Sequence, residues 1–484
     1  MHTEVAYIVV TKWLQMRTPQ RFAAGFGMLA GISRLALGLM MGLVPSCALD
    51  EGSFSDDAVT SGDLAAPDGE EVASESVCTQ GPIRCHAHVR TSKAGLRITS
   101  HAAPMGLGPA DLQDAYKINP ASTVTSRPVV AIVDAYGYTA LESDLAKYRS
   151  QYGLPPCTIA SGCLKVVNQT GQVTPLPANP PATDDWTVET ALDVDMVSAA
   201  CPLCRILVVQ ATNNLGDGLY VAQNAAAALG PTVISNSWGG PEQPNTSLAA
   251  QEAYFVHPSI AIFVAAGDDG YNDAGMGPDY PGTSTHVIAV GGTKLVRDTS
   301  PRGWSETAWT KGGSACSLSI PKPAYQTKSP CAFKATTDIA AVGDPATGLA
   351  VYNAANGGWM VIGGTSASAP FVAALFAATG NGAQSTGAFI GANASKLFDV
   401  TTGSNGTCPA GSLLCNAAVG WDGPTGYGTP NAALLTRGGT PGKAGGQATD
   451  VEDFTGGCST GGRGTGGGAL LGLALLGLGR RRRR

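Results

Sequence analysis

Charge, histidine and paired CxxC motifs are all scarce in this sequence. Only 14% of its residues are charged, and the formal net charge is −6. Because the chain has no excess of positive charge to attract the phosphate backbone of a nucleic acid, nucleic-acid binding is excluded as a leading function. The 484 residues are 44% hydrophobic, which is enough to bury one large core or two modest ones and excludes a chain that is disordered throughout.

The cysteines are more numerous than a cytosolic enzyme usually carries, and they occur in local pairs. Cys201 and Cys204 form the only CxxC among twelve cysteines, so a zinc site is not expected. The spacing predicts five short-loop disulfides, although it leaves open that some of these residues are free buried thiols. The predicted pairs are Cys78–Cys85, Cys157–Cys163, Cys201–Cys204, Cys316–Cys331 and Cys408–Cys415.

The first part of the chain, 1–47, has the pattern of a secretory signal peptide. No acidic residue occurs between Glu4 and Asp50, and several basic residues precede the apolar run LALGLMMGLV at 35–44. The run ends in VPSC, which is similar to a bacterial lipoprotein cleavage box, so the sequence leaves lipidation of Cys47 open.

The last part of the chain also resembles a processing signal. A Gly/Thr-rich linker at 437–465 contains Cys458 and leads into 466–484, where a short apolar stretch is followed by Arg480–Arg484. This arrangement resembles the C-terminal sorting tail of myxobacterial surface proteins. The alternative is a marginal membrane anchor held by the arginines. Either interpretation predicts a secreted or cell-surface body, with membrane or surface anchoring through the ends.

Between the two ends, composition separates a polar segment from one folded body. The segment 48–105 is rich in Ser, Asp and Glu and is predicted to be a short pro-region or linker; 106–436 is the body. Apolar runs without strict alternation predict strands covered on both faces, at 128–136, 204–211, 232–238, 260–268, 286–293 and 360–364. Helical stretches fall between several of them, at 139–153, 187–200, 215–230 and 369–380. This alternation predicts an α/β fold with a parallel sheet.

The stretch GGTSASAP at 363–370 predicts a tight strand-to-helix turn that presents Ser366. A serine hydroxyl is a weak nucleophile until a base removes its proton, and that base is usually histidine. Asp134 ends the first predicted strand of the body, where a Ser-His-Asp enzyme would place its aspartate. No histidine has a suitable context: His2 lies in the leader, His86, His88 and His101 precede the body, His257 lies in a loop, and His286 begins a strand.

Carboxyl groups offer a different base. Glu189 and Asp193 are four residues apart, so on a helix they share one face and favour a single shared proton. The alternative is an ordinary solvated acidic face, but the neighbouring residues are apolar. Asp268 ends a predicted strand, where a buried and protonated carboxyl could donate a hydrogen bond to an oxyanion. The alternative is that Gly267–Asp268 is simply a turn at the end of the strand.

Together, GTSAS, ExxxD, SNSWG and AGDDG, over about 106–436, resemble the sedolisin family, the serine-carboxyl peptidases with a subtilisin-like fold. The resemblance implies one catalytic domain, with a parallel sheet covered by helices on both faces. It implies Ser366 as nucleophile, Glu189 as general base, Asp193 as its partner and Asp268 as oxyanion donor. The expected activity is acid-active endopeptidase cleavage of a protein or peptide substrate, and the expected state is a monomer.

The resemblance also implies one structural Ca²⁺. Its ligands would be the Asp399 and Asp422 carboxylates and the carbonyls of Val400, Ala418 and Gly420. Oxygen ligands of this kind suit a hard cation. Ala418 stands where glycine is usual, but a carbonyl ligand does not depend on the side chain. Without the resemblance both aspartates are ordinary turn residues.

Two other functions stay open at this point. The first is a catalytically inactive surface binding protein on a peptidase scaffold. The second is a Ser-His-Asp subtilase that uses an unrecognised histidine, for which His257 and His286 are the residues to test. The chain also departs from the resembled family, whose long folded propeptide has only the short segment 48–105 as its counterpart.

Overall fold

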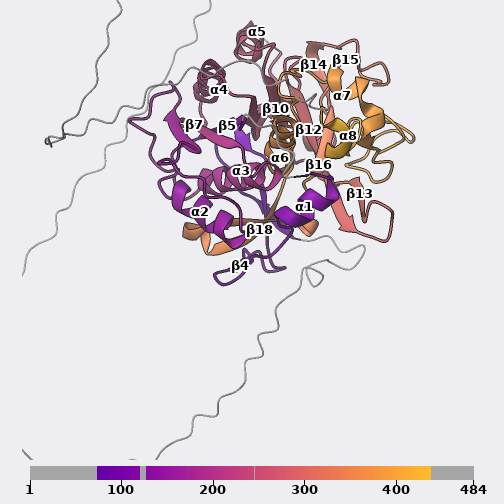
Figure 1. Cartoon of the computed structure of the whole chain (residues 1–484). Helices are drawn as coiled ribbons and strands as arrows, with labels where there is room; N and C mark the ends of the chain where they lie inside the picture. Colours follow the sequence, from indigo (N-terminus) through magenta and orange to yellow (C-terminus); the bar gives the residue numbers. More distant parts are fainter. Residues whose placement is uncertain (1–72, 120–126, 245, 438–484) are drawn as a thin grey trace, which may run out of the picture. The chain divides into compact units, whose positions relative to one another are not determined.

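The computed structural model describes residues 73–119, 127–244 and 246–437 (Figure 1). The predicted signal peptide and the tail at 466–484 lie outside the described residues, as do Cys47, Cys458 and nearly all of the linker. Within the described part of the chain, no helix combines the length and the apolar character needed to span a bilayer.

The core of the fold is an eight-stranded, mainly parallel sheet. Its strands are β5 (Val129–Ala135), β6 (Leu164–Asn168), β7 (Arg205–Ala211), β8 (Val233–Asn236), β10 (Ala261–Ala265), β12 (Ile288–Arg297), β13 (Trp304–Ala308) and β16 (Ile339–Val342). The order is β13-β12-β10-β8-β5-β7-β6, and β16 pairs with β12. Only the β12–β13 pair is antiparallel. The β6, β13 and β16 strands were not among the predicted runs.

Helices cover both faces of this sheet. They are α1 (Pro109–Ala115), α2 (Leu141–Gln151), α3 (Trp186–Ala200), α4 (Gly218–Ala228), α5 (Thr246–Glu252), α6 (Thr365–Ala378), α7 (Ala388–Ala392) and α8 (Ala432–Leu435). The central strands β5 and β7 are nearly continuous runs of Val, Ile and Leu, buried on both faces. The α3 and α6 helices pack together over the sheet, and α4 packs against β5, β7 and β8 (Figure 1). The predicted subtilisin-like α/β fold is confirmed.

One predicted strand belongs to a different sheet. The run at 360–364 becomes β18 (Gly358–Gly363), which pairs antiparallel with β17 (Leu349–Asn353), β3 (His88–Arg90) and β4 (Thr99–Ser100), while β1 (Ser74–Ser76) pairs with β3. Its assignment to the parallel sheet was wrong, because a short buried apolar run carries no information about the direction of its partners.

Residues 73–105, the described part of the predicted pro-region, belong to the folded unit. Besides β1, β3 and β4, it contributes β2 (Arg84–Cys85), which pairs with β9 (Trp238–Pro241), and β9 also pairs with β11 (Asp279–Tyr280). The compositional boundary at 105/106 therefore does not mark an edge of the fold. Two small antiparallel pairs complete the strands: β14 (Cys316–Pro321) with β15 (Phe333–Ala335), and β19 (Leu397–Phe398) with β20 (Thr429–Pro430).

All five predicted disulfides are present, so the prediction from spacing is confirmed. Each closes a loop of 3 to 15 residues in sequence separation. Short loops of this kind tie down local turns and connections. One of them, Cys78–Cys85, lies beside the candidate site described next.

Candidate active site

Ser366 lies at the turn where β18 gives way to α6, as the sequence predicted. Gly364 makes the turn with φ of +104°, a conformation that favours glycine. A Cβ at Gly364 would collide with the His86 carbonyl oxygen and with Asp268 Oδ2. The buried Ser366 hydroxyl donates to the Ser237 carbonyl oxygen at 3.0 Å and accepts from the His86 backbone N–H at 2.9 Å.

Glu189 and Asp193 lie on α3, and both are fully buried. Asp193 Oδ1 accepts a hydrogen bond from the Ser237 hydroxyl at 2.9 Å, whereas neither Glu189 oxygen has a hydrogen-bond partner among the described residues. Burial raises the pKa of both carboxyls well above the usual range, and the charge of Asp134 raises both further. The Ser366 hydroxyl acts in the opposite direction on Glu189. The solvated acidic face considered from the sequence is thereby excluded.

Asp134 is a third buried carboxyl at this place. It lies near the end of β5, and both of its oxygens lack hydrogen-bond partners among the described residues. Burial raises its pKa to about 7. The sequence marked Asp134 only as the aspartate of a histidine triad, because nothing in the chain order shows that β5 brings it to Glu189 and Asp193. Three neighbouring carboxyls in an apolar setting cannot all be ionised at once, so the cluster shares at least one proton.

Asp268 lies against the turn that presents Ser366. Its Oδ1 accepts hydrogen bonds from the backbone N–H and the hydroxyl of Thr365, both at 2.8 Å. Its Oδ2 is buried without a hydrogen-bond partner among the described residues, and burial raises the pKa of Asp268 well above the usual range. A protonated Oδ2 would be a hydrogen-bond donor beside the Ser366 N–H.

Two histidines come close to the site, which sequence reasoning did not anticipate. His88 Nε2 lies 3.7 Å from Asp268 Oδ2, and His86 Nε2 lies 3.6 Å from Asp279 Oδ2. Burial lowers the pKa of both imidazoles to about 4. Among the described residues, no histidine ring nitrogen forms a hydrogen bond with the Ser366 hydroxyl; His257, for example, contacts the Tyr254 carbonyl at 3.1 Å.

The residues predicted to bind calcium lie in two loops, at 399–400 and 418–422, which follow Ser366 in the sequence. Asp399 Oδ2 accepts from the Gly420 N–H and Asp422 Oδ2 accepts from the Ala418 N–H, both at 2.9 Å, so the two predicted loops lie together. The Val400 side chain is buried. Burial raises the pKa of Asp422 to about 7, and the Asp399 charge contributes to that rise.

Comparisons with known proteins show that this chain is similar to the subtilisin-like serine peptidases. A family model described as the Subtilase family matches residues 184–401, the part that carries both α3 and α6. More specifically, the chain is similar to the sedolisin and kumamolisin peptidases.

Kumamolisin from Bacillus sp. (strain MN-32) is 32% identical over 364 residues, covering 68% of this chain and 63% of its own length. The chain thus spans slightly less than two thirds of kumamolisin. Sedolisin from Pseudomonas sp. (strain 101) is 24% identical over 404 residues, covering 76% of this chain and 67% of sedolisin. The solved structure of Pseudomonas sedolisin, a serine-carboxyl proteinase in complex with two molecules of pseudo-iodotyrostatin, has a TM-score of 0.58 at 25% identity and covers 69% of this chain and 98% of that one.

Proposed function

We propose that this chain is an acid-active serine-carboxyl endopeptidase that hydrolyses peptide bonds through an acyl-enzyme on Ser366. The observation that carries the proposal is the buried Glu189 carboxyl next to Ser366, with neither oxygen bonded to another described residue. A buried carboxylate with a free oxygen is a strong proton acceptor, because burial disfavours its charge.

Each carboxyl has a separate role in this mechanism. Glu189 accepts the proton of Ser366 as the hydroxyl attacks the substrate carbonyl, and later delivers it to the leaving amine. Asp193, held by the Ser237 hydroxyl, positions Glu189 and shares its proton. Asp268 remains protonated and, together with the Ser366 N–H, donates to the oxyanion. Because Asp268 must be protonated, we expect activity to be greatest at acidic pH.

The two alternative functions receive less support. An inactive binding scaffold would have no need to keep several partnerless carboxyls buried, since isolated buried charges are destabilising. A Ser-His-Asp mechanism needs an imidazole at the Ser366 hydroxyl, and none of the described histidines makes that contact.

A serine-directed probe tests whether the site is reactive. After incubation at acidic pH, a fluorophosphonate should label the wild-type protein on the peptide that contains Ser366, as read by mass spectrometry, because only an activated serine reacts readily. Ser366→Ala should abolish the label. Ser368→Ala is the matched control on the same helix and should leave labelling unchanged. Absence of any label in correctly folded wild type would favour the inactive scaffold.

We propose in addition that one Ca²⁺ binds at the Asp399 and Asp422 loops. The support is that the Gly420 N–H donates to Asp399 and the Ala418 N–H donates to Asp422, so the loops that hold the two carboxylates lie together. A bound cation would offset the burial and, to a smaller extent, the Asp399 charge that raise the pKa of Asp422. Its contribution would be to the stability of this loop cluster, since the cluster contains none of the residues assigned to catalysis.

Removal of calcium should therefore lower the melting temperature. A ligand that binds only the folded state at about 100 times its Kd stabilises by about 2.7 kcal/mol, which corresponds to several degrees in a domain of this size. Asp399→Asn should remove the sensitivity to chelator in a calorimetric scan, whereas Asp217→Asn, at an exposed aspartate, should retain it. A wild-type melting curve that does not change with chelator would rule out the calcium site.

Secretion and surface sorting also belong to the proposal. Five disulfides in the described residues suit an oxidising compartment. Surface material should lack the arginine cluster at 480–484, and mass spectrometry that finds this cluster still attached would contradict sorting by the tail.

A further inference from the structure

Asp268 lies on a loop, 266–271, here called the donor loop, that packs against a second stretch of backbone. This second stretch, 310–314, is here called the support segment. The Gly267 carbonyl, directly before Asp268, accepts a hydrogen bond from the Gly313 N–H at 2.6 Å. The position of the proposed oxyanion donor therefore depends on where the support segment lies.

The two backbones touch without side chains between them. A Cβ at Gly313 would collide with the Ala266 carbonyl oxygen, and Gly267 has a φ of +105°, which favours glycine. Because the contact is so close, any displacement of Gly313 also displaces Gly267 and, with it, Asp268.

Asn405 holds the support segment from behind. Its side chain is buried, and Nδ2 donates to the Gly312 carbonyl oxygen at 2.6 Å and to the Ser314 hydroxyl oxygen at 2.7 Å. These two residues lie on either side of Gly313 in the chain. One amide group therefore fixes the residue that contacts the donor loop.

Asn405 also contacts the donor loop directly, on the far side of Asp268. Its carbonyl oxygen accepts from the Tyr271 N–H at 2.8 Å. A Cβ at Gly270 would collide with the same oxygen, so the loop passes as close to Asn405 as a glycine allows. The donor loop is thus held by Asn405 at its end and, through the support segment, at its beginning.

Asn405 is itself held by the strand-like pairing of two short stretches. Its N–H donates to the Cys415 carbonyl at 3.1 Å, and Ser404 forms an antiparallel bridge with Asn416. The Cys408–Cys415 disulfide closes the loop that joins these stretches, so they cannot move far apart.

We propose that Asn405 is a positioning residue for the oxyanion donor: through Gly313 and Tyr271 it fixes the loop that presents Asp268 to the turn of Ser366. This inference rests on the proposed function and adds to it a residue that touches neither the serine nor the substrate. An oxyanion donor must lie within hydrogen-bond distance of the developing charge, and a displacement of about 1 Å can cost about 10²-fold in rate.

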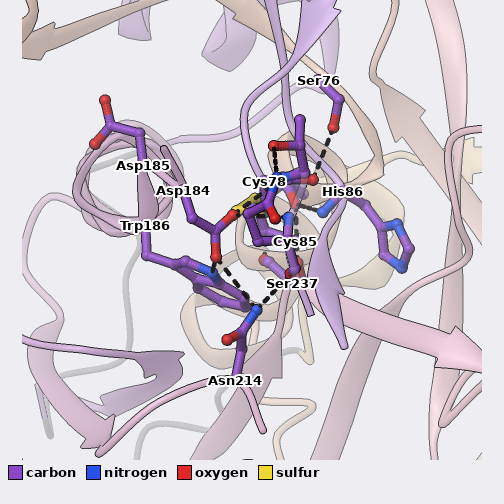
Figure 2. The surroundings of a disulfide bond; sticks show 12 residues. Ser76, Cys78, Cys85, His86, Asp184, Asp185, Trp186, Asn214 and Ser237 are labelled. Atoms are coloured by element: carbon purple, nitrogen blue, oxygen red, sulfur yellow. Dashed lines mark hydrogen bonds between the residues drawn. A yellow bond between two sulfur atoms is a disulfide. The ribbon is translucent and has the colours of Figure 1, made fainter. Parts of the chain in front are cut away.

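A purely structural role for Asn405 must be told apart from this one, because loss of its amide also leaves a buried carbonyl without a partner. Asn214 offers a matched control. It is as buried as Asn405, and its amide also donates to backbone carbonyls, those of Gln80 at 2.7 Å and Ile83 at 2.9 Å. Figure 2 shows Asn214 beside Trp186, close to the Cys78–Cys85 disulfide, and its printed partners do not include the donor loop.

The test measures kcat and KM for a quenched peptide at acidic pH, with each asparagine changed in two backgrounds. In the wild-type background, Asn405→Ala should lower kcat by about tenfold or more and change KM by less than about twofold, since the lost interaction acts only in the transition state. In the Asp268→Ala background, it should lower kcat by less than about twofold, because no donor carboxyl remains to be misplaced. Any effect of Asn214→Ala on kcat should be the same in both backgrounds.

Two further variants keep the test decisive if Asn405→Ala folds poorly in a thermal melt. Asn405→Asp keeps the shape of the side chain and has a single O–H donor at acidic pH, so it should lower kcat less than Asn405→Ala. Asn416→Ala removes an amide that donates to the Ser412 carbonyl at 3.0 Å, within the same disulfide loop. It should leave kcat within about twofold of wild type.

Several results would overturn the inference. An equal loss of kcat from Asn405→Ala in both backgrounds, a change carried by KM alone, or wild-type kcat would leave Asn405 a structural residue and the proposed function standing. Wild-type kcat in Asp268→Ala would refute the donor role on which the inference depends. A folded wild type that does not hydrolyse peptides would refute the proposed function and this inference together.

Discussion

Replacement of Glu189 by glutamine should lower kcat by about 10³- to 10⁴-fold while the fold stays intact. The amide has almost the same shape as the carboxyl but cannot accept the Ser366 proton. Since both Glu189 oxygens are buried without partners among the described residues, the variant should be at least as stable as wild type. The measurement is turnover of a quenched peptide substrate at acidic pH, together with a thermal melt.

Asp195→Asn provides a matched control for this experiment. Asp195 is buried on the same helix, and burial raises its pKa as well, but its Oδ2 accepts from the Tyr352 N–H at 3.2 Å and lies outside the Ser366 cluster. The same acid-to-amide change there should leave kcat near the wild-type value. Near wild-type turnover by Glu189→Gln would refute the carboxylate base and revive the histidine alternative.

Substitutions of Asp268 should change how kcat depends on pH, and this change would distinguish the role of the oxyanion donor from that of the base. In wild type the donor is the protonated carboxyl, so kcat should fall as pH rises through the pKa of Asp268, which burial holds well above its usual range. Asp268→Asn keeps an N–H donor at every pH and should extend activity to higher pH. Asp268→Ala removes the donor and should cost about 10²- to 10³-fold at all pH values.

The direction of the pH profile distinguishes the two bases. A histidine base must be neutral, so its activity would increase with pH, whereas protonation of Asp268 gives the opposite slope. Peptide hydrolysis measured across pH 3 to 8 for wild type, Asp268→Asn and Asp268→Ala would show which applies. A wild-type profile that rises toward neutral pH, or identical upper limits in wild type and Asp268→Asn, would contradict the role of Asp268.

The features that depend on short stretches of chain could be predicted from the sequence. The five disulfides follow from cysteines 3 to 15 residues apart, which meet in any compact turn. The pairing of Glu189 with Asp193 follows from helix periodicity, and the apolar residues around them indicate burial. The strand-to-helix turn at Ser366 follows from its glycines. These properties are local, so the order of residues determines them directly.

Contacts between distant segments were decided only by the tertiary structure. Asp134 joins Glu189 and Asp193 because β5 ends beside α3, and the apolar run that became β18 pairs with strands that composition had assigned outside the body. The segment around His86 is polar and has few apolar side chains, so its composition does not indicate that it packs against the rest of the fold. It is held by backbone pairing to β9 and β18 and by its disulfide, and backbone hydrogen bonds form with almost any side chains. The sequence could therefore name the serine and its carboxyls, whereas the peptide bond that lies against them follows from strand pairing alone.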